Sequence, residues 1–149
     1  MIDKESLLEI ANRADAVYLA TVDGTSPRIR AMVNLRRQDQ YPEPSQVCRA
    51  DGFACYFSTS MSSGKVREVR SNPAASAYYC DPLTFRGATF SGKMEILTGP
   101  ELKKALWDEG WRIYWTGADD PDYVILRLKP TEATGWYAGK PFHVDLRKL

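Results

Sequence analysis

The sequence predicts a mainly β fold with some α (α+β): a closed or half-open antiparallel barrel of about six or seven strands with short helices between them. Segments rich in β-branched and aromatic residues recur along the chain and are separated by turn residues. Most follow one another in hairpin order, whereas alternating strands and helices would indicate parallel βαβ units. A length of 149 residues suits a single domain, residues 1–149.

The N-terminal part predicts a helix followed by a β-hairpin. Asp3 is a suitable N-cap for a helix over residues 3–13, which carries apolar residues at helical spacing. Residues 16–22 and 28–34 are rich in strand formers, and the residues between them have turn composition. Alternation in the second strand places Arg28, Arg30 and Met32 on one face and Ile29, Ala31 and Val33 on the other. We expect the first face to be basic and the second to belong to the core.

Residues 53–73 predict a strand, a hydroxyl-rich turn and a helix. The aromatic run over 53–57 indicates the strand, and the serines and threonine that follow it end the run. Ser62 or Ser63 can cap the helix, and Asn72-Pro73 ends it.

The remaining elements are less regular. Residues 35–52 are polar, contain two prolines and show no clear periodicity, which predicts a long loop. Thr98-Gly99-Pro100-Glu101 has the composition of a capping box that opens a helix. The other expected elements are strands over 74–80, 88–97 with a possible bulge at Gly92, 123–128 and 133–137, and a short helical segment with Trp111 and Tyr114.

Composition excludes several classes of protein. Twenty basic and nineteen acidic residues leave a net charge of +1, so no overall field favours nucleic acid or an anionic membrane. No apolar segment approaches the roughly 20 residues of a membrane span, and the N-terminus lacks a signal-peptide pattern. We expect a cytoplasmic protein without nucleic-acid or membrane partners.

The cysteines and the histidine do not form a recognisable catalytic or metal site. Cys48, Cys55 and Cys80 are odd in number and irregularly spaced, so we expect small buried or half-buried residues rather than disulfides or zinc ligands. His143 is the only histidine and lies near the C-terminus, which we expect to be loose. The carboxylates around Pro121 read as turn residues, and packing is the favoured role of the tryptophans. No catalytic side chain is identified.

The turn before the helix at residue 64 has the composition of an anion site. Unpaired backbone N–H groups, the positive end of the helix dipole, hydroxyls and Lys65 converge there, which suits a phosphate dianion. A Walker A loop is excluded, because Val66 follows Gly64-Lys65 and no glycine lies five residues before Gly64. An ordinary serine-rich connection to a solvated basic helix remains the alternative.

Several segments, taken in order, resemble the FMN-binding split-barrel superfamily of pyridoxamine 5′-phosphate oxidase-like proteins, and within it the general stress protein 26 type. The resemblance covers most of residues 15–137. The matching segments are Pro27-Arg28-Ile29-Arg30-Ala31-Met32, Phe57-Ser58-Thr59-Ser60, Ser63-Gly64-Lys65-Val66-Arg67, Asn72-Pro73, Gly92-Lys93-Met94-Glu95 and Asp120-Pro121-Asp122-Tyr123-Val124.

The resemblance implies an FMN cofactor and a homodimer with flavins at the subunit interface. It implies that the segment Arg30, Ala31, Met32 and Val33 runs along the flavin with its backbone facing the ring edge. Ser58, Thr59 and Ser63 would lie on the ribityl-phosphate side, and Lys65 would bind the phosphate.

Two departures limit what the resemblance implies. Some relatives have a basic residue directly before the phosphate lysine, whereas this chain has Gly64, so its pocket holds fewer cations. Phe142-His143-Val144-Asp145 does not match the Arg-x-His pattern of authentic pyridoxamine phosphate oxidases, whose activity is therefore not expected. A flavin-dependent oxidoreductase is the leading hypothesis. A non-enzymatic flavin-binding stress protein, or a relative that uses deazaflavin or haem, is the alternative.

Overall fold

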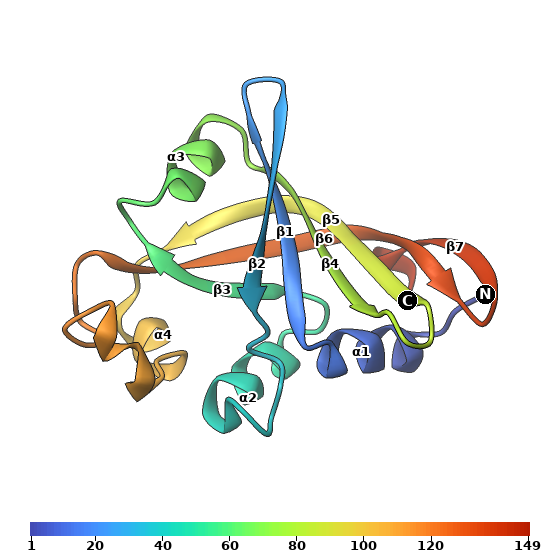
Figure 1. Ribbon diagram of the computed structural model, residues 1–149, viewed down its shortest axis with the longest axis horizontal. Coiled ribbons are helices and arrows are strands. Elements are labelled where there is room, and N and C mark those ends of the chain that lie inside the picture. The colour runs from blue at the N-terminus through green and yellow to red at the C-terminus, as the bar shows by residue number, and fades with distance from the viewer.

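The computed structural model describes residues 1–149 as one seven-stranded antiparallel sheet with four α-helices, consistent with a split barrel (Figure 1). The predicted fold class is therefore confirmed. The strands are β1 (Ala16–Asp23), β2 (Ser26–Val33), β3 (Cys55–Ser60), β4 (Ala74–Asp81), β5 (Arg86–Leu97), β6 (Tyr123–Tyr137) and β7 (Lys140–Asp145). The helices are α1 (Lys4–Arg13), α2 (Pro42–Ala50), α3 (Gly64–Ser71) and α4 (Pro100–Ala105), with 3-10 turns η1 (Glu109–Ile113) and η2 (Leu146–Lys148).

The strand order leaves two open edges. The sheet runs β2-β1-β4-β5-β6-β3, and β7 pairs with the other part of the long strand β6. β2 and β3 are thus edge strands, each with a row of backbone groups that no neighbouring strand pairs. α3 follows β3 directly and leads back to β4, so it joins one edge of the sheet to its middle (Figure 1).

Two apolar clusters lie on opposite sides of β3 and β6. The larger one fills the barrel and includes Phe57, Phe90 and Leu126 together with the buried sides of α1 and α3. The smaller one gathers Trp111, Trp115 and other aromatic rings beneath α2 and α4. Because successive residues of a strand point to opposite faces, β3 contributes alternate side chains to the two clusters.

Several local predictions are confirmed. Asp3 caps α1, accepting the Ser6 N–H at 2.8 Å, and of the two candidate caps for α3 it is Ser63 that accepts the Lys65 N–H, at 3.0 Å. The β5–β6 register shifts between Ser91 and Gly92, as expected for a bulge. All three cysteines are buried or half-buried.

The prediction of a loop over residues 35–52 is wrong, because residues 42–50 form α2. Pro42 and Pro44 occupy the first turn of this helix, where their missing N–H groups would have no intrahelical partner in any case. Buried Arg36 fixes the segment, donating to Asn12 Oδ1 at 3.1 Å and to the carbonyls of Cys48, Gly52 and Ala54.

The C-terminal predictions need three corrections. β6 is one continuous strand of 15 residues rather than two, since the bulge at Gly92 lets the pairing continue past Pro130. The C-terminus is not loose, because residues 140–145 pair with β6 as β7. Gly99 rather than Thr98 is the N-cap of α4, and no side chain caps it, so the predicted capping box does not form.

The prediction for the two faces of the hairpin strand is reversed. Arg30 and Met32 lie on the inner face opposite buried Leu19 and Val17, whereas the apolar set lies on the outer face. That outer face continues across β1, β4 and β6, and its large apolar members are Ile29 (70% exposed), Val33 (43%), Tyr18 (42%), Tyr78 (39%) and Trp136 (47%). We call these five residues the outer apolar face.

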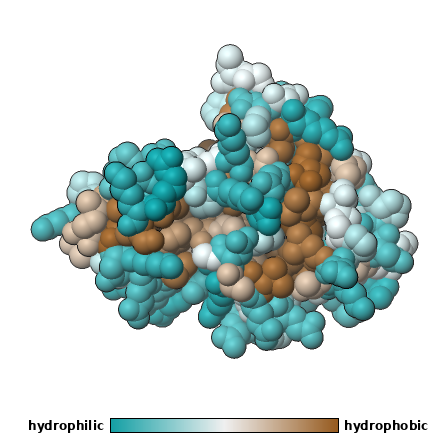
Figure 2. Space-filling model, turned by 180° about the vertical axis from the view of Figure 1, so that it is seen from behind, coloured by the Kyte–Doolittle hydropathy of each residue, from teal (hydrophilic) through white to brown (hydrophobic).

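No helix of the protein is long and apolar enough to cross a membrane. The space-filling view from behind shows apolar residues reaching the surface as continuous areas bordered by polar ones (Figure 2). Continuous areas of this kind are typical of interaction surfaces rather than of scattered exposed side chains.

Candidate functional site

The start of α3 presents free donors to solvent. Ser63 accepts the Lys65 N–H through its hydroxyl and the Val66 N–H through its carbonyl at 3.2 Å. Gly64, the first residue of the helix, is exposed, and its N–H has no acceptor within the chain. Because the N-terminus of a helix also carries a partial positive charge, this N–H is suited to bind an anion.

The turn that leads into α3 is fixed by the segment before β6. The Asp122 carboxylate accepts the Ser62 N–H at 2.9 Å and the Ser62 hydroxyl at 3.2 Å, and its carbonyl accepts the Met61 N–H. The hydroxyl-rich turn is therefore a fixed structure rather than a loose connection.

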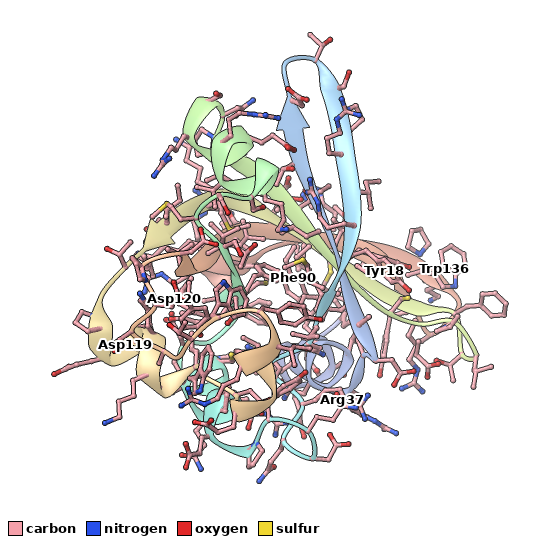
Figure 3. The ribbon with its side chains drawn as sticks, turned by 60° about the vertical axis from the view of Figure 1, so that its left-hand side comes forward. Tyr18, Arg37, Phe90, Asp119, Asp120 and Trp136 are labelled. Carbon is pink, nitrogen blue, oxygen red and sulfur yellow. The ribbon has the colours of Figure 1, made fainter.

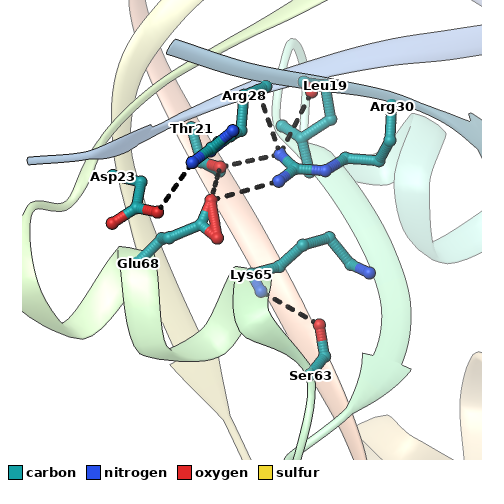
Figure 4. Close-up of polar contacts among 8 residues, drawn as sticks. All are labelled: Leu19, Thr21, Asp23, Arg28, Arg30, Ser63, Lys65 and Glu68. Atoms are coloured by element: carbon teal, nitrogen blue, oxygen red, sulfur yellow. Dashed lines mark hydrogen bonds and ion pairs between the residues drawn. The ribbon is translucent and has the colours of Figure 1, made fainter. Parts of the chain in front are cut away.

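Lys65 is a half-buried cation without an ion-pair or hydrogen-bond partner. Burial lowers the pKa of its ammonium group, nearby Arg30 lowers it further, and Glu68 partly opposes the shift. Figure 4 shows its side chain passing beside Arg30 with a free terminal nitrogen. An unpaired cation beside another cation is unfavourable unless an anion joins them, so this environment favours an anionic ligand.

The Arg30 guanidinium is tied into the inner face of the hairpin. Its Nη1 donates to the Thr21 hydroxyl at 2.7 Å and to the carbonyls of Leu19 and Arg28, and its Nη2 donates to Glu68 Oε1 at 3.2 Å (Figure 4). The Thr21 hydroxyl donates to the same carboxylate oxygen at 2.8 Å. Glu68 and Arg30 thus join α3 to β1 and β2, with side chains 7% and 24% exposed.

We expect Arg30→Ala to destabilise the fold by about 2–4 kcal/mol, because it leaves the buried Glu68 carboxylate without its charged partner. Urea denaturation measures the change. Arg28→Ala is the matched control, since it removes an exposed ion pair with Asp23 from the same strand and should cost about 0.5 kcal/mol or less. Equal losses in the two variants would contradict a structural role for the Arg30–Glu68 pair.

The other predicted site residues divide between the two faces of the sheet. Met32 packs against the barrel core, whereas the side chains of Ala31 and Val33 belong to the outer face, so only their backbone could contact a ligand at the β2 edge. Thr59 lies on the same face of β3 as the core residue Phe57. Ser58 points the other way, and its hydroxyl lies 3.1 Å from that of Tyr123.

Most tryptophans of the second half of the chain lie in the smaller apolar cluster and not at the start of α3. Trp107, Trp111 and Trp115 pack around Tyr123, with ring centroids 5.1, 6.3 and 4.9 Å from it. Of the four tryptophans, Trp136 alone belongs to the outer apolar face. Figure 3 shows Trp136 and Tyr18 on the same side of the molecule.

The carboxylates around Pro121 have structural roles. Asp120 accepts the N–H groups of Thr116 and Asp122, both at 2.9 Å, and these hydrogen bonds lower the pKa of its carboxyl group. Asp119 and Asp120 lie together in the loop before β6 (Figure 3). The prediction that these residues form a turn fits this arrangement.

Two acidic residues of the site were not predicted from the sequence. Glu68 lies between Val66 and Val69 on the buried side of α3, and an acidic residue beside an apolar stripe is the signal that could have revealed it. Asp122 offered no comparable signal, because its contact with Ser62 joins residues 60 positions apart.

Fold and site together define a split-barrel domain in which a helix N-terminus with a free N–H lies beside an open sheet edge. The chain belongs to the pyridoxamine 5′-phosphate oxidase family, since the family model of that description matches residues 3–137.

The chain is similar to general stress proteins of this family. It is 27% identical over 146 residues to General stress protein 26 of Bacillus subtilis (strain 168), covering 96% of this chain and 94% of that protein. The crystal structure of a protein related to general stress protein 26 from Clostridium acetobutylicum matches with a TM-score of 0.77 at 26% identity, over 99% of both chains.

Two more distant relatives of known structure share the fold and are described as binding different ligands. A pyridoxamine 5′-phosphate oxidase-related, FMN binding protein from Nostoc punctiforme has a TM-score of 0.63 at 17% identity, over 99% of this chain and 86% of that one. A heme binding protein from Mycobacterium smegmatis has a TM-score of 0.67 at 17% identity, over 97% and 60%. The fold therefore occurs with either ligand.

Proposed function

We propose that this protein binds FMN, one molecule per chain, at the start of α3, and that it acts as a flavin-dependent oxidoreductase in a homodimer. The observation that carries the proposal is the half-buried Lys65 ammonium, which has no partner in the chain and belongs to the residue directly after Gly64, whose N–H is also free. A phosphate group would accept a hydrogen bond from each and relieve the repulsion between Lys65 and Arg30.

The flavin ring fits along the edge of β2. The phosphate position fixes one end of FMN at α3, and the Arg30–Glu68 pair holds that end of α3 against the inner face of β2. The segment Arg30 to Val33 presents backbone groups that no neighbouring strand pairs, and these can donate to and accept from the polar edge of an isoalloxazine ring. Thr59 and Ser63 lie on the side where the ribityl chain would run.

The outer apolar face supports the homodimer. Its residues come from β2, β1, β4 and β6, with β5 between the last two. The Tyr78 ring lies over Gly87 of β5, the residue paired with Trp136, so it connects the two parts of the face. A single chain exposes this face beside the Arg30 to Val33 segment, so a second copy related by twofold symmetry would cover it and close the ring site.

The only histidine favours FMN over haem. A haem iron takes an axial side-chain ligand, most often histidine. His143 is exposed and lies 2.7 Å from Glu132 across β6 and β7, on strands away from α3. The unpaired groups at the start of α3 are the Lys65 ammonium and the Gly64 N–H, which match the phosphate group of FMN.

When bound, FMN supplies the redox chemistry, because its ring can accept a hydride equivalent. The chain's own residues bind and orient it: Lys65 and the Gly64 N–H hold the phosphate, and the β2 edge holds the ring. Substrates would then approach the ring from the side that the two subunits leave open.

We expect the protein to bind about one FMN per chain and to melt at a higher temperature in its presence. A ligand that binds only the folded state stabilises it by mass action, by about 2.7 kcal/mol at 100 times its dissociation constant. Flavin fluorescence titration gives the stoichiometry, and a thermal melt gives the shift. An unchanged melting temperature at saturating FMN would count against the proposal.

Turnover distinguishes the oxidoreductase from a protein that only stores or senses flavin. The FMN-loaded protein should oxidise NADH or NADPH in the presence of an electron acceptor, which is followed by loss of absorbance at 340 nm. FMN binding without such turnover would retain the cofactor assignment and favour the non-enzymatic alternative.

A further inference from the structure

The charges at the start of α3 leave the proposed phosphate undercompensated. A phosphate monoester carries about 1.5 to 2 negative charges at pH 7. Arg30 and Glu68 form an ion pair at 3.2 Å, so together they contribute little net charge. Of Arg30, Glu68 and Lys65, only Lys65 then contributes an uncompensated positive charge. A second cation is needed to neutralise a phosphate that carries nearly two negative charges.

Arg30 is poorly placed to be that second cation. Its Nη1 already has three acceptors within the chain, and its Nη2 has Glu68. Turning the guanidinium toward a ligand would break these contacts and leave a buried carboxylate with only the Thr21 hydroxyl. We therefore expect Arg30 to keep its contacts with Glu68, Thr21 and the backbone when a ligand binds.

The Arg67 side chain has no partner and belongs to the first turn of α3. Its side chain is exposed and takes part in no ion pair or hydrogen bond within the chain, whereas its backbone N–H donates to the Ser63 carbonyl at 3.5 Å. A β-carbon placed on Gly64 would lie 3.9 Å from Arg67 Nη2 and 3.5 Å from Glu68 Oε2. Since helical side chains lean toward the N-terminus, Arg67 reaches back by one turn toward Gly64.

Gly64 places no side chain next to the guanidinium. A β-carbon at this position would make ordinary van der Waals contacts with Arg67 Nη2 and Glu68 Oε2 and would displace neither. The guanidinium therefore lies near the helix start with no side chain of residue 64 between them.

We propose that Arg67 is the second phosphate-binding cation, an inference that rests on the proposed function above. Glu68 pairs with Arg30, which therefore positions α3 against the hairpin instead of binding the phosphate. Arg67 and Lys65 then hold the phosphate from the two sides of Gly64. Glu68 weakens the site, since its Oε2 lies near the same position, and this limits the affinity for FMN.

The test compares FMN with riboflavin, which lacks the phosphate, by flavin fluorescence titration of four proteins: wild type, Arg67→Ala, Arg67→Lys and Arg70→Ala. Arg70 is the matched control, because it lies on the same helix, is also exposed and donates to Met61 Sδ at 3.1 Å instead of reaching the helix start. All four should have the same melting temperature without flavin, since surface substitutions of this kind change stability little.

We expect Arg67→Ala to weaken FMN binding by roughly 10-fold or more, as for loss of a charge-assisted hydrogen bond, and to leave riboflavin unchanged. Arg67→Lys should recover most of the loss, and Arg70→Ala should change FMN affinity less than about 2-fold. Added salt should weaken FMN binding less in Arg67→Ala than in wild type.

Equal FMN affinities of Arg67→Ala and Arg70→Ala, or an equal loss for riboflavin, would overturn the role of Arg67 while leaving FMN binding by the wild type intact. A wild-type protein that binds neither flavin would instead overturn the proposed function, and the role of Arg67 with it.

Discussion

Lys65→Ala is expected to weaken FMN binding by about 10- to 150-fold, the equivalent of one charge-assisted hydrogen bond of roughly 1.5–3 kcal/mol. Lys65 has no partner in the chain, so its removal costs the folded protein no internal contact and acts on the ligand alone. Fluorescence titration of FMN and riboflavin measures the effect, and riboflavin affinity should be almost unchanged. A parallel loss for both ligands would place Lys65 away from the phosphate.

A second substitution, Lys65→Met, separates the effect on FMN binding from the effect on stability. Burial and Arg30 lower the pKa of Lys65, which means that the free fold disfavours its charged form. The charged ammonium therefore destabilises the flavin-free fold. This destabilisation is complete below the lowered pKa and is lost as pH rises through it. Lys65→Met removes the charge, so it should leave the melting temperature of the flavin-free protein unchanged or higher. FMN affinity of the wild type should fall as pH rises through that pKa. A destabilised flavin-free Lys65→Met protein would show that the ammonium has an internal partner.

If the proposed homodimer forms, Tyr18→Glu is expected to convert it into monomers and to weaken FMN binding as well. Tyr18 lies between Ala31 and Tyr78 on the outer apolar face, and a twofold interface would bury two copies of the new carboxylate. At about 2–3 kcal/mol for each unpaired buried charge, the dimer dissociation constant should rise roughly 10³- to 10⁴-fold. Light scattering at micromolar concentration, with and without FMN, measures the state.

Ile113→Glu is the control for this experiment. Ile113 is also apolar and strongly exposed, but it lies on η1 and not on the outer apolar face. The variant should remain dimeric and bind FMN normally. A monomeric wild type in the presence of FMN, or a Tyr18→Glu dimer, would refute the proposed interface, whereas monomers that still bind FMN with wild-type affinity would show that each site lies within one chain.

Short-range chemistry explains why much of the fold is visible in the sequence. Asp3 and Ser63 mark helix starts because a cap accepts from an N–H two or three residues away. Gly92 also marks the bulge, but the contact that requires glycine there is long-range, since a β-carbon would meet the Lys129 carbonyl of the paired strand. The prolines of α2 misled the prediction because proline ends a helix in one position and begins it in another.

The order of hydroxyls, Gly64 and Lys65 likewise predicted the helix N-terminus with its free donors, because these are formed by consecutive residues. FMN itself, and the roles of Arg30, Ala31, Met32, Val33, Ser58, Thr59, Ser63 and Lys65 toward it, remain predictions that the binding experiments address.

By itself, the sequence determined the mainly β fold class, most of the strands, the cap of α1 and the hydroxyl-rich composition of residues 58–63, all of which depend on neighbours in the chain. Tertiary structure alone decided which face of β2 is covered and which cation is free. α3 packs on the inner face and brings Glu68 to Arg30 across 38 positions, so the arginine is paired and the apolar residues are left outside. Alternation shows that two faces differ, but only long-range packing fixes which of them the core takes.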